Sequence, residues 1–144
     1  MTAGNATSTL HYRIPLIIWM AVILAVSSIP EPTLQKVGFS VKDYLAHGIE
    51  YSILGFLSFR LFRAQGKTAL AAWLLVILFA FFMGAVDETY QRLIPGRTAS
   101  LSDYAADLAG SSAGGLIAIV YYALTQRLRV SAGAGIETDR GVDS

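Results

Sequence analysis

Four long apolar segments limit what this chain can fold into more strongly than any other feature. They cover residues 14–29, 44–62, 69–88 and 101–125. A bilayer core about 30 Å thick requires about 20 helical residues, with about 17 as the lower limit. The last three segments meet this length and the first is marginal. The sequence therefore predicts an all-α integral membrane protein with four transmembrane helices.

The composition agrees with a membrane location. Hydrophobic residues make up 54% of the 144 residues and charged residues 15%, compared with about a quarter charged in soluble domains. A net charge of +1, with no long basic run, argues against a nucleic-acid partner. The absence of cysteine excludes disulfides, thiolate metal sites and cysteine nucleophiles. The length fits a single domain.

The first apolar segment has a second interpretation. Ala25-Val26-Ser27 resembles the small-residue cleavage site of a secretory signal peptide. Only Arg13 and His11 precede the segment as a basic region, which favours a retained helix over a cleaved one.

The distribution of charge predicts the orientation. With four spans, both termini lie on one side, and the short connection around residues 60–67 lies there too. Lys and Arg concentrate on cytoplasmic loops. That side carries Arg13, Arg60, Arg63, Lys67, Arg127 and Arg129. We therefore expect a cytoplasmic N-terminus over residues 1–13, a membrane domain over 14–125 and a disordered cytoplasmic tail over 126–144.

Polar residues at the opposite ends of the predicted helices form the candidate site. Residues three and four positions apart share a helix face, so His47, Glu50 and Tyr51 lie together. On the fourth helix, acids are followed by Gly110 and Gly114, whose small size lets helix backbones approach closely in a bilayer. The candidate site residues are His47, Glu50, Tyr51, Asp87, Gln91, Arg97, Asp103 and Asp107.

Three kinds of chemistry could use this set. His47 and Glu50 could hold a metal ion with an acid from another helix. His47, Glu50 and Asp87 could instead act in general acid–base catalysis. In the third alternative, Tyr51, Gln91, Arg97, Asp103 and Asp107 bind a lipid or peptide headgroup without turnover. The residues identify no cofactor and no oligomeric state.

Structural roles are the competing interpretation. Arg97 could clamp the fold instead of binding a ligand, and Glu88 is expected to pair with Arg92 one helical turn away. Two patterns, residues 40–43 and 100–103, resemble helix capping boxes, so Asp103 could serve as a cap.

The order of these motifs resembles one membrane-protein family. His47-Gly48-Ile49-Glu50-Tyr51-Ser52-Ile53-Leu54-Gly55 is similar to the H-x-x-x-Y-x-x-L-G segment of VanZ-like proteins. Residues 87–97 resemble that family's E-x-x-Q…P-G-R segment. Residues 100–114 resemble its S-x-x-D-x-x-x-N-x-x-G-x-x-x-G segment, with Asp107 in place of the usual asparagine.

The resemblance implies a multi-pass protein of the bacterial plasma membrane, in contact with the lipid bilayer. It implies an accessory or binding role at the cell envelope, related to resistance to teicoplanin-type glycopeptides. The partner would be an envelope lipid or a peptidoglycan precursor. The alternative is a membrane-embedded hydrolase or transferase that acts on a lipid-linked envelope substrate, with or without a metal.

Overall fold

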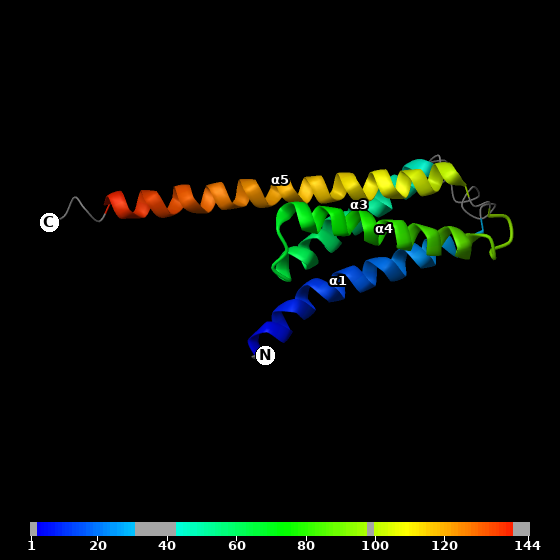
Figure 1. The fold of residues 1–144 in the computed structure, drawn as a ribbon, viewed down its shortest axis with the longest axis horizontal. Helices are drawn as coiled ribbons and strands as arrows, with labels where there is room; N and C mark the ends of the chain where they lie inside the picture. The colour runs from blue at the N-terminus through cyan, green and yellow to red at the C-terminus, as the bar shows by residue number, and fades with distance from the viewer. Residues whose placement is uncertain (1–2, 31–42, 98–99, 140–144) are drawn as a thin grey trace.

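A computed structural model describes residues 3–30, 43–97 and 100–139, and all of its regular structure is helical. The helices are α1 (Ala3–Ser27), α3 (Asp43–Ala64), α4 (Ala69–Gln91) and α5 (Leu101–Asp139), as Figure 1 shows. Leu10–Ser27, Ala69–Gln91 and Leu101–Leu128 are long and apolar enough to cross a membrane. Helix α3 does not join them, because charged and polar residues at both of its ends lower its hydropathy.

Two helices extend beyond the ranges expected from the sequence. Helix α1 begins at Ala3 and contains Pro15 in its interior, whereas the sequence predicted a helix start near that proline. Membrane helices tolerate internal proline because neighbouring groups satisfy the freed backbone. Helix α5 continues to Asp139, through residues predicted to be disordered. Once nucleated, a helix gains one hydrogen bond per added residue, and no proline follows Pro95 to stop it.

Short turns set the helices antiparallel. Gly66, with φ of 81°, lies in the turn between α3 and α4, and the Thr68 hydroxyl caps α4 by accepting the Ala71 N–H. Gly96, with φ of 80°, lies in the turn after α4. Glycine takes such positive φ values without steric cost. The first of the two capping patterns, at residues 40–43, falls largely outside the described residues.

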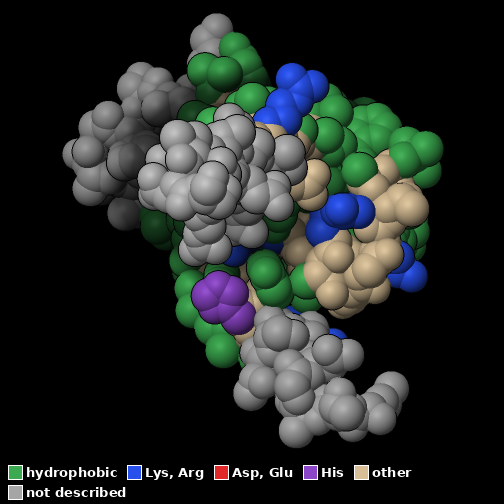
Figure 2. All heavy atoms as spheres, turned by 90° about the vertical axis from the view of Figure 1, so that its left-hand side faces the viewer, with side chains coloured by type: hydrophobic (Ala, Val, Ile, Leu, Met, Phe, Trp, Pro, Cys, Tyr) green, Lys and Arg blue, Asp and Glu red, His purple; other side chains and the backbone are tan. Residues whose placement is uncertain are grey.

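The two ends of the bundle differ in charge. The first turns of α1, the α3–α4 turn and the far end of α5 lie toward the same side (Figure 1). Figure 2 looks onto this side, where Lys and Arg side chains are visible and no described Asp or Glu side chain appears. The start of α3, the end of α4 and the start of α5 meet at the opposite side and carry Asp43, Glu50, Asp87, Glu88, Asp103 and Asp107.

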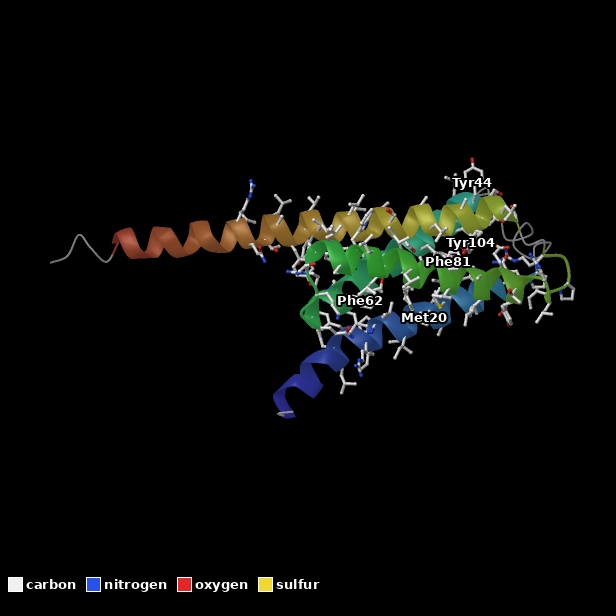
Figure 3. All side chains as sticks on the ribbon, viewed as in Figure 1. Met20, Tyr44, Phe62, Phe81 and Tyr104 are labelled. Atoms are coloured by element: carbon white, nitrogen blue, oxygen red, sulfur yellow. The ribbon has the colours of Figure 1, made fainter. Side chains whose placement is uncertain are left out.

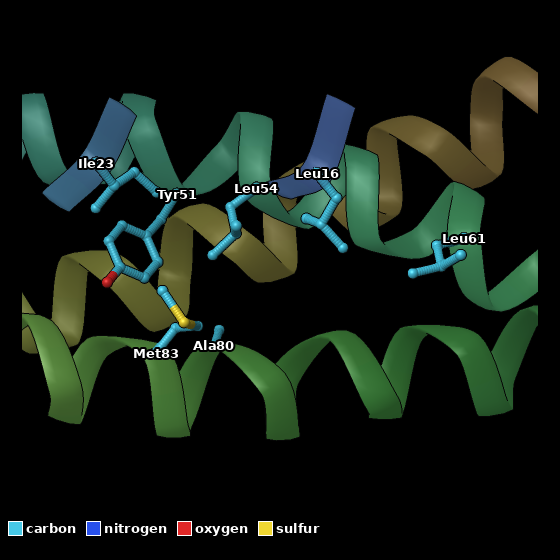
Figure 4. Packing of buried hydrophobic residues seen from close by; sticks show 7 residues of the cluster. All are labelled: Leu16, Ile23, Tyr51, Leu54, Leu61, Ala80 and Met83. Atoms are coloured by element: carbon cyan, nitrogen blue, oxygen red, sulfur yellow. The ribbon is translucent and has the colours of Figure 1, made fainter. Parts of the chain in front are cut away.

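Helix α3 supplies side chains to both apolar clusters of the bundle. One cluster joins it to α1 and α4 (Figure 4) and comprises Leu16, Ile23, Tyr51, Leu54, Leu61, Ala80 and Met83. The other joins it to α4 and α5 and comprises Phe59, Ala72, Val76 and Ala118. Large apolar side chains on the outer faces, such as Ile17, Phe82 and Ile117, are exposed. Such faces suit hydrocarbon rather than water.

Helices α3 and α5 touch backbone to backbone. A methyl group at Gly114 would collide with the carbonyl oxygen of Ser52, and one at Gly55 would collide with that of Ser111. The Ser111 hydroxyl donates to the Tyr51 carbonyl at 3.1 Å. Small residues allow this approach, which confirms that the glycines of the fourth apolar segment face a neighbouring helix.

This close contact between α3 and α5, the α3–α5 seam, predicts different effects for two glycine-to-alanine changes. Gly114→Ala should lower the free energy of unfolding by about 1–3 kcal/mol, because overpacking forces the helices apart. Gly48→Ala is the matched control, since a methyl group there meets no atom within 4 Å. It should be neutral or stabilise the protein by up to about 1 kcal/mol. Thermal denaturation in detergent measures both. Equal stability of the two variants would contradict the close α3–α5 contact.

Candidate functional site

The polar ends of four helices converge into a buried cluster. Seven polar or charged side chains there have exposed fractions of 7% or less: Ser27, His47, Asp87, Glu88, Gln91, Asp103 and Asp107. They come from α1, α3, α4 and α5. Buried polar groups cost free energy unless they find partners, so the geometry of their contacts decides what the cluster can do.

A direct contact between helices in the cluster joins His47 and Asp107. The Nδ1 atom of His47 on α3 lies 2.9 Å from Oδ1 of Asp107 on α5. The two residues are 60 positions apart in sequence, and the α3–α5 seam brings them together. A carboxylate on one ring nitrogen fixes the orientation of the imidazole and favours a proton on that nitrogen.

Gln91 connects three of the helices. Its Nε2 atom donates to Oδ2 of Asp87 at 2.9 Å, one turn earlier on α4. The same nitrogen lies 3.4 Å from both the Ser27 hydroxyl on α1 and Nε2 of His47. Two N–H groups therefore serve three acceptors, so the two longer contacts share one donor.

Glu88 has a different role from the one its sequence predicted. Its Oε2 atom accepts the Ser100 N–H at 2.9 Å, and no ion pair joins it to Arg92 in the described part of the chain. Ser100 precedes α5, and its hydroxyl accepts the Ser102 N–H at 3.1 Å. The carboxylate thus satisfies a backbone donor at a helix N-terminus, where negative charge is favoured.

Several buried oxygens of the described residues lack a hydrogen-bond partner. They are the Tyr51 hydroxyl, Oδ1 of Asp87, Oε1 of Glu88 and Oδ2 of Asp107. An unsatisfied buried polar group costs about 1–3 kcal/mol, and such groups are uncommon in native proteins. Three of these oxygens belong to the cluster and the Tyr51 hydroxyl borders it, so the cluster holds acceptors that its described side chains leave unsatisfied.

Three residues of the cluster could hold a metal ion. His47, Glu88 and Asp107 each offer a ligand atom, and these atoms lie within 4.8 Å of one another. From the sequence, His47 and Glu50 were the residues expected in this role. Glu50 falls outside the group, although its carboxylate lies within electrostatic range of His47, Asp87 and Asp107. It is only half-buried, and its backbone carbonyl accepts the Trp19 indole N–H at 2.8 Å.

Arg97 lies against the end of α1. Its Nε atom donates to the Ile29 carbonyl at 3.1 Å and its Nη2 atom to the Val26 carbonyl at 3.0 Å. A cation that binds the last carbonyls of a helix also complements the helix dipole. The contacts of Arg97 therefore match the structural clamp considered in the sequence analysis, and its Nη1 atom stays outside these two hydrogen bonds.

Aromatic side chains border the cluster. The Tyr51 ring is buried and lies nearly parallel to the His47 ring, with 6.5 Å between centroids. Tyr104 on α5 donates its hydroxyl to the Phe81 carbonyl at 3.1 Å, and the two rings meet edge to face (Figure 3). Gly84 packs closely against Asp107, because a methyl group at position 84 would lie 3.0 Å from Oδ2 of Asp107.

Ser27 was not among the candidate site residues predicted from the sequence, and Glu88 was expected to pair with Arg92. Helical spacing could have found Glu88, because it continues the buried stripe of α4 through Ala80 and Gly84 at four-residue intervals. Ser27 has no such signal. It lies 64 residues from Gln91 in sequence, and only the packing of α1 brings the two together.

The sequence of the chain matches one known protein family. Residues 12–124 match VanZ/LLP1. The chain belongs to the VanZ/LLP1 family. No curated protein and no solved structure shows a significant match. The match covers the membrane domain predicted from the sequence except for residue 125, and it includes every residue of the buried cluster. With its three apolar helices, this VanZ/LLP1 protein is a membrane protein.

Proposed function

We propose that this VanZ/LLP1 protein crosses the bacterial plasma membrane four times and has both termini in the cytoplasm. Helix α3 has 22 residues, enough to span a bilayer core. Its packing against α1, α4 and α5 shields polar side chains that lipid would not tolerate. The Lys and Arg residues near the termini and the α3–α4 turn support the orientation.

Cysteine labelling tests this topology, because the chain has no native cysteine. Gln65 is exposed in the α3–α4 turn, and Leu93 is exposed just after α4. A membrane-impermeant maleimide should label Leu93→Cys in intact cells and Gln65→Cys only after permeabilisation. The reverse pattern would place the termini outside the cytoplasm, and equal labelling of both positions in intact cells would contradict a single span, α4, between Gln65 and Leu93.

Within this topology, we infer that the buried cluster acts at the envelope-facing side as a binding site. The observation that carries this inference is the concentration of buried hydrogen-bonding groups at one end of an otherwise apolar bundle. Gln91, Asp103, Asp107 and Tyr51 would shape the site, and the Nη1 atom of Arg97 would meet an anionic headgroup. An envelope lipid or peptidoglycan precursor fits this chemistry, and binding it would reduce sensitivity to teicoplanin-type glycopeptides.

Drug susceptibility tests the binding role. Overexpression of the wild-type protein should raise the minimal inhibitory concentration of teicoplanin in a sensitive host. Asp107→Ala should remove the effect, because it deletes the contact that orients His47. His11→Gln, a change of the exposed histidine at the other end of α1, should retain it. Immunoblots of membranes confirm equal protein levels. Unchanged susceptibility with the wild-type protein would contradict the proposal.

The His47–Asp107 contact favours a second candidate, a membrane-embedded hydrolase or transferase. An imidazole oriented by a carboxylate is the arrangement of a general base. The substrate would be a lipid-linked envelope molecule, with Glu50 or Asp87 as further acid–base groups.

Turnover by purified protein distinguishes this candidate from a binding role. Asp107→Asn should lower kcat for a lipid-linked precursor by about 10²–10⁴-fold with a smaller change in KM, as expected for loss of acid–base catalysis. Glu50→Gln tests the acid nearest to His47 on the same helix. Absence of turnover by the wild-type protein would remove the enzymatic candidate and leave the binding role in place.

A further inference from the structure

We propose that His47, Glu88 and Asp107 form a site for a divalent transition-metal cation of the Zn²⁺ type. One ligand comes from each of α3, α4 and α5, and the three ligand atoms lie within 4.8 Å of one another. Atoms at such separations can reach one cation at bond lengths of about 2.0–2.2 Å after small side-chain adjustments. The site is inside the bundle, and all three side chains are buried.

The carboxylates are held in the way that metal ligands usually are. Each has one oxygen fixed by a hydrogen bond: Oδ1 of Asp107 by His47, and Oε2 of Glu88 by the Ser100 N–H. The other oxygen of each, Oδ2 of Asp107 and Oε1 of Glu88, is buried without a partner. Hydrogen bonds that orient a ligating carboxylate are a regular part of metal sites. The fold thus leaves two acceptors available that a cation would satisfy.

The donor atoms select the kind of cation. One imidazole nitrogen with carboxylate oxygens suits Zn²⁺ and related divalent ions, and three protein ligands leave a position open for water or a ligand. Ca²⁺ takes six to eight oxygen ligands, which this group does not provide. Soft thiolate sites are excluded because the chain has no cysteine.

Charge balance supports a cation at this position. Two ionised carboxylates in an apolar surrounding are costly unless they are paired or bind a metal. The guanidinium of Arg97 donates to the carbonyls of Val26 and Ile29 rather than to these acids. A divalent cation would neutralise both carboxylates and link the three helices. This inference does not rest on the proposed function, because such a link serves a binding protein and an enzyme equally.

Zinc titration of the full chain tests the site. The protein should be purified in detergent with an affinity tag that contains no histidine, and zinc binding followed by calorimetry and elemental analysis. We expect one Zn²⁺ per chain. Glu88→Gln and Asp107→Asn should each raise the Kd at least about 100-fold, since even loss of an outer contact costs 10–100-fold. The matched control is Glu50→Gln, which removes a nearby acid outside the group and should change the Kd only a few-fold.

The two histidines of the chain provide a spectroscopic control. X-ray absorption at the zinc edge of the loaded wild-type protein should show one imidazole with oxygen ligands and no sulfur. His47→Gln should remove the imidazole signal and His11→Gln should keep it, because His11 is exposed on α1, 16 positions before Ser27 of the cluster. The wild-type spectrum needs no variant, so it stays informative if a substitution prevents folding.

The possible outcomes separate this site from the proposed function. No saturable zinc binding by the wild-type protein would overturn the site. Equal Kd values for Glu88→Gln, Asp107→Asn and Glu50→Gln, or a zinc spectrum without imidazole, would do the same. None of these measurements uses a drug or a lipid. Zinc binding without any change in teicoplanin susceptibility would therefore retain the site and remove only the proposed role in resistance.

Discussion

The close contact between α3 and α5 is the constraint on which the rest of the structure depends. Glycines at positions 55, 110 and 114 let the two backbones approach to distances that any side chain would prevent. In a bilayer, helices associate through such packing because lipid already satisfies their apolar faces. This approach sets His47 beside Asp107 and aligns the start of α3 with the start of α5. Without the seam, the cluster would be a set of isolated polar groups in separate helices.

Helix period and residue size predicted much of this arrangement from the sequence. The small residues of α5 indicated a helix contact, and the acids that precede them on the same stripe indicated which side chains turn inward. Asp107, His47, Asp87 and Gln91 were identified in this way, and all are buried. The family resemblance agrees with the match of residues 12–124 to VanZ/LLP1. Within a helix, position along the sequence determines direction in space, so such patterns are reliable.

The remaining features depend on contacts between helices, which the sequence does not encode locally. Ser27 reaches Gln91 across 64 positions, and Glu88 reaches Ser100 across the turn that follows α4. The sequence predicted a local alternative for Glu88, a pair with Arg92 one turn away. The Glu88–Arg92 pair does not form because Glu88 belongs to the buried stripe of α4. A buried carboxylate gains more from a backbone N–H at a helix N-terminus than from an exposed side chain.

The position of Arg97 determines how the buried acids can be neutralised. Arginine is the most natural partner for a carboxylate because it offers two parallel donors. Here the guanidinium donates two hydrogen bonds, to the carbonyls of Val26 and Ile29, and these bonds attach α1 to the rest of the bundle. The charge of Asp87, Glu88 and Asp107 must then be balanced by His47, by protons or by a bound cation. A single imidazole cannot balance three carboxylates, and protonated acids would use their hydroxyl groups as donors. The unpartnered oxygens on all three acids are therefore better explained by a cationic or hydrogen-bonding ligand that completes the site.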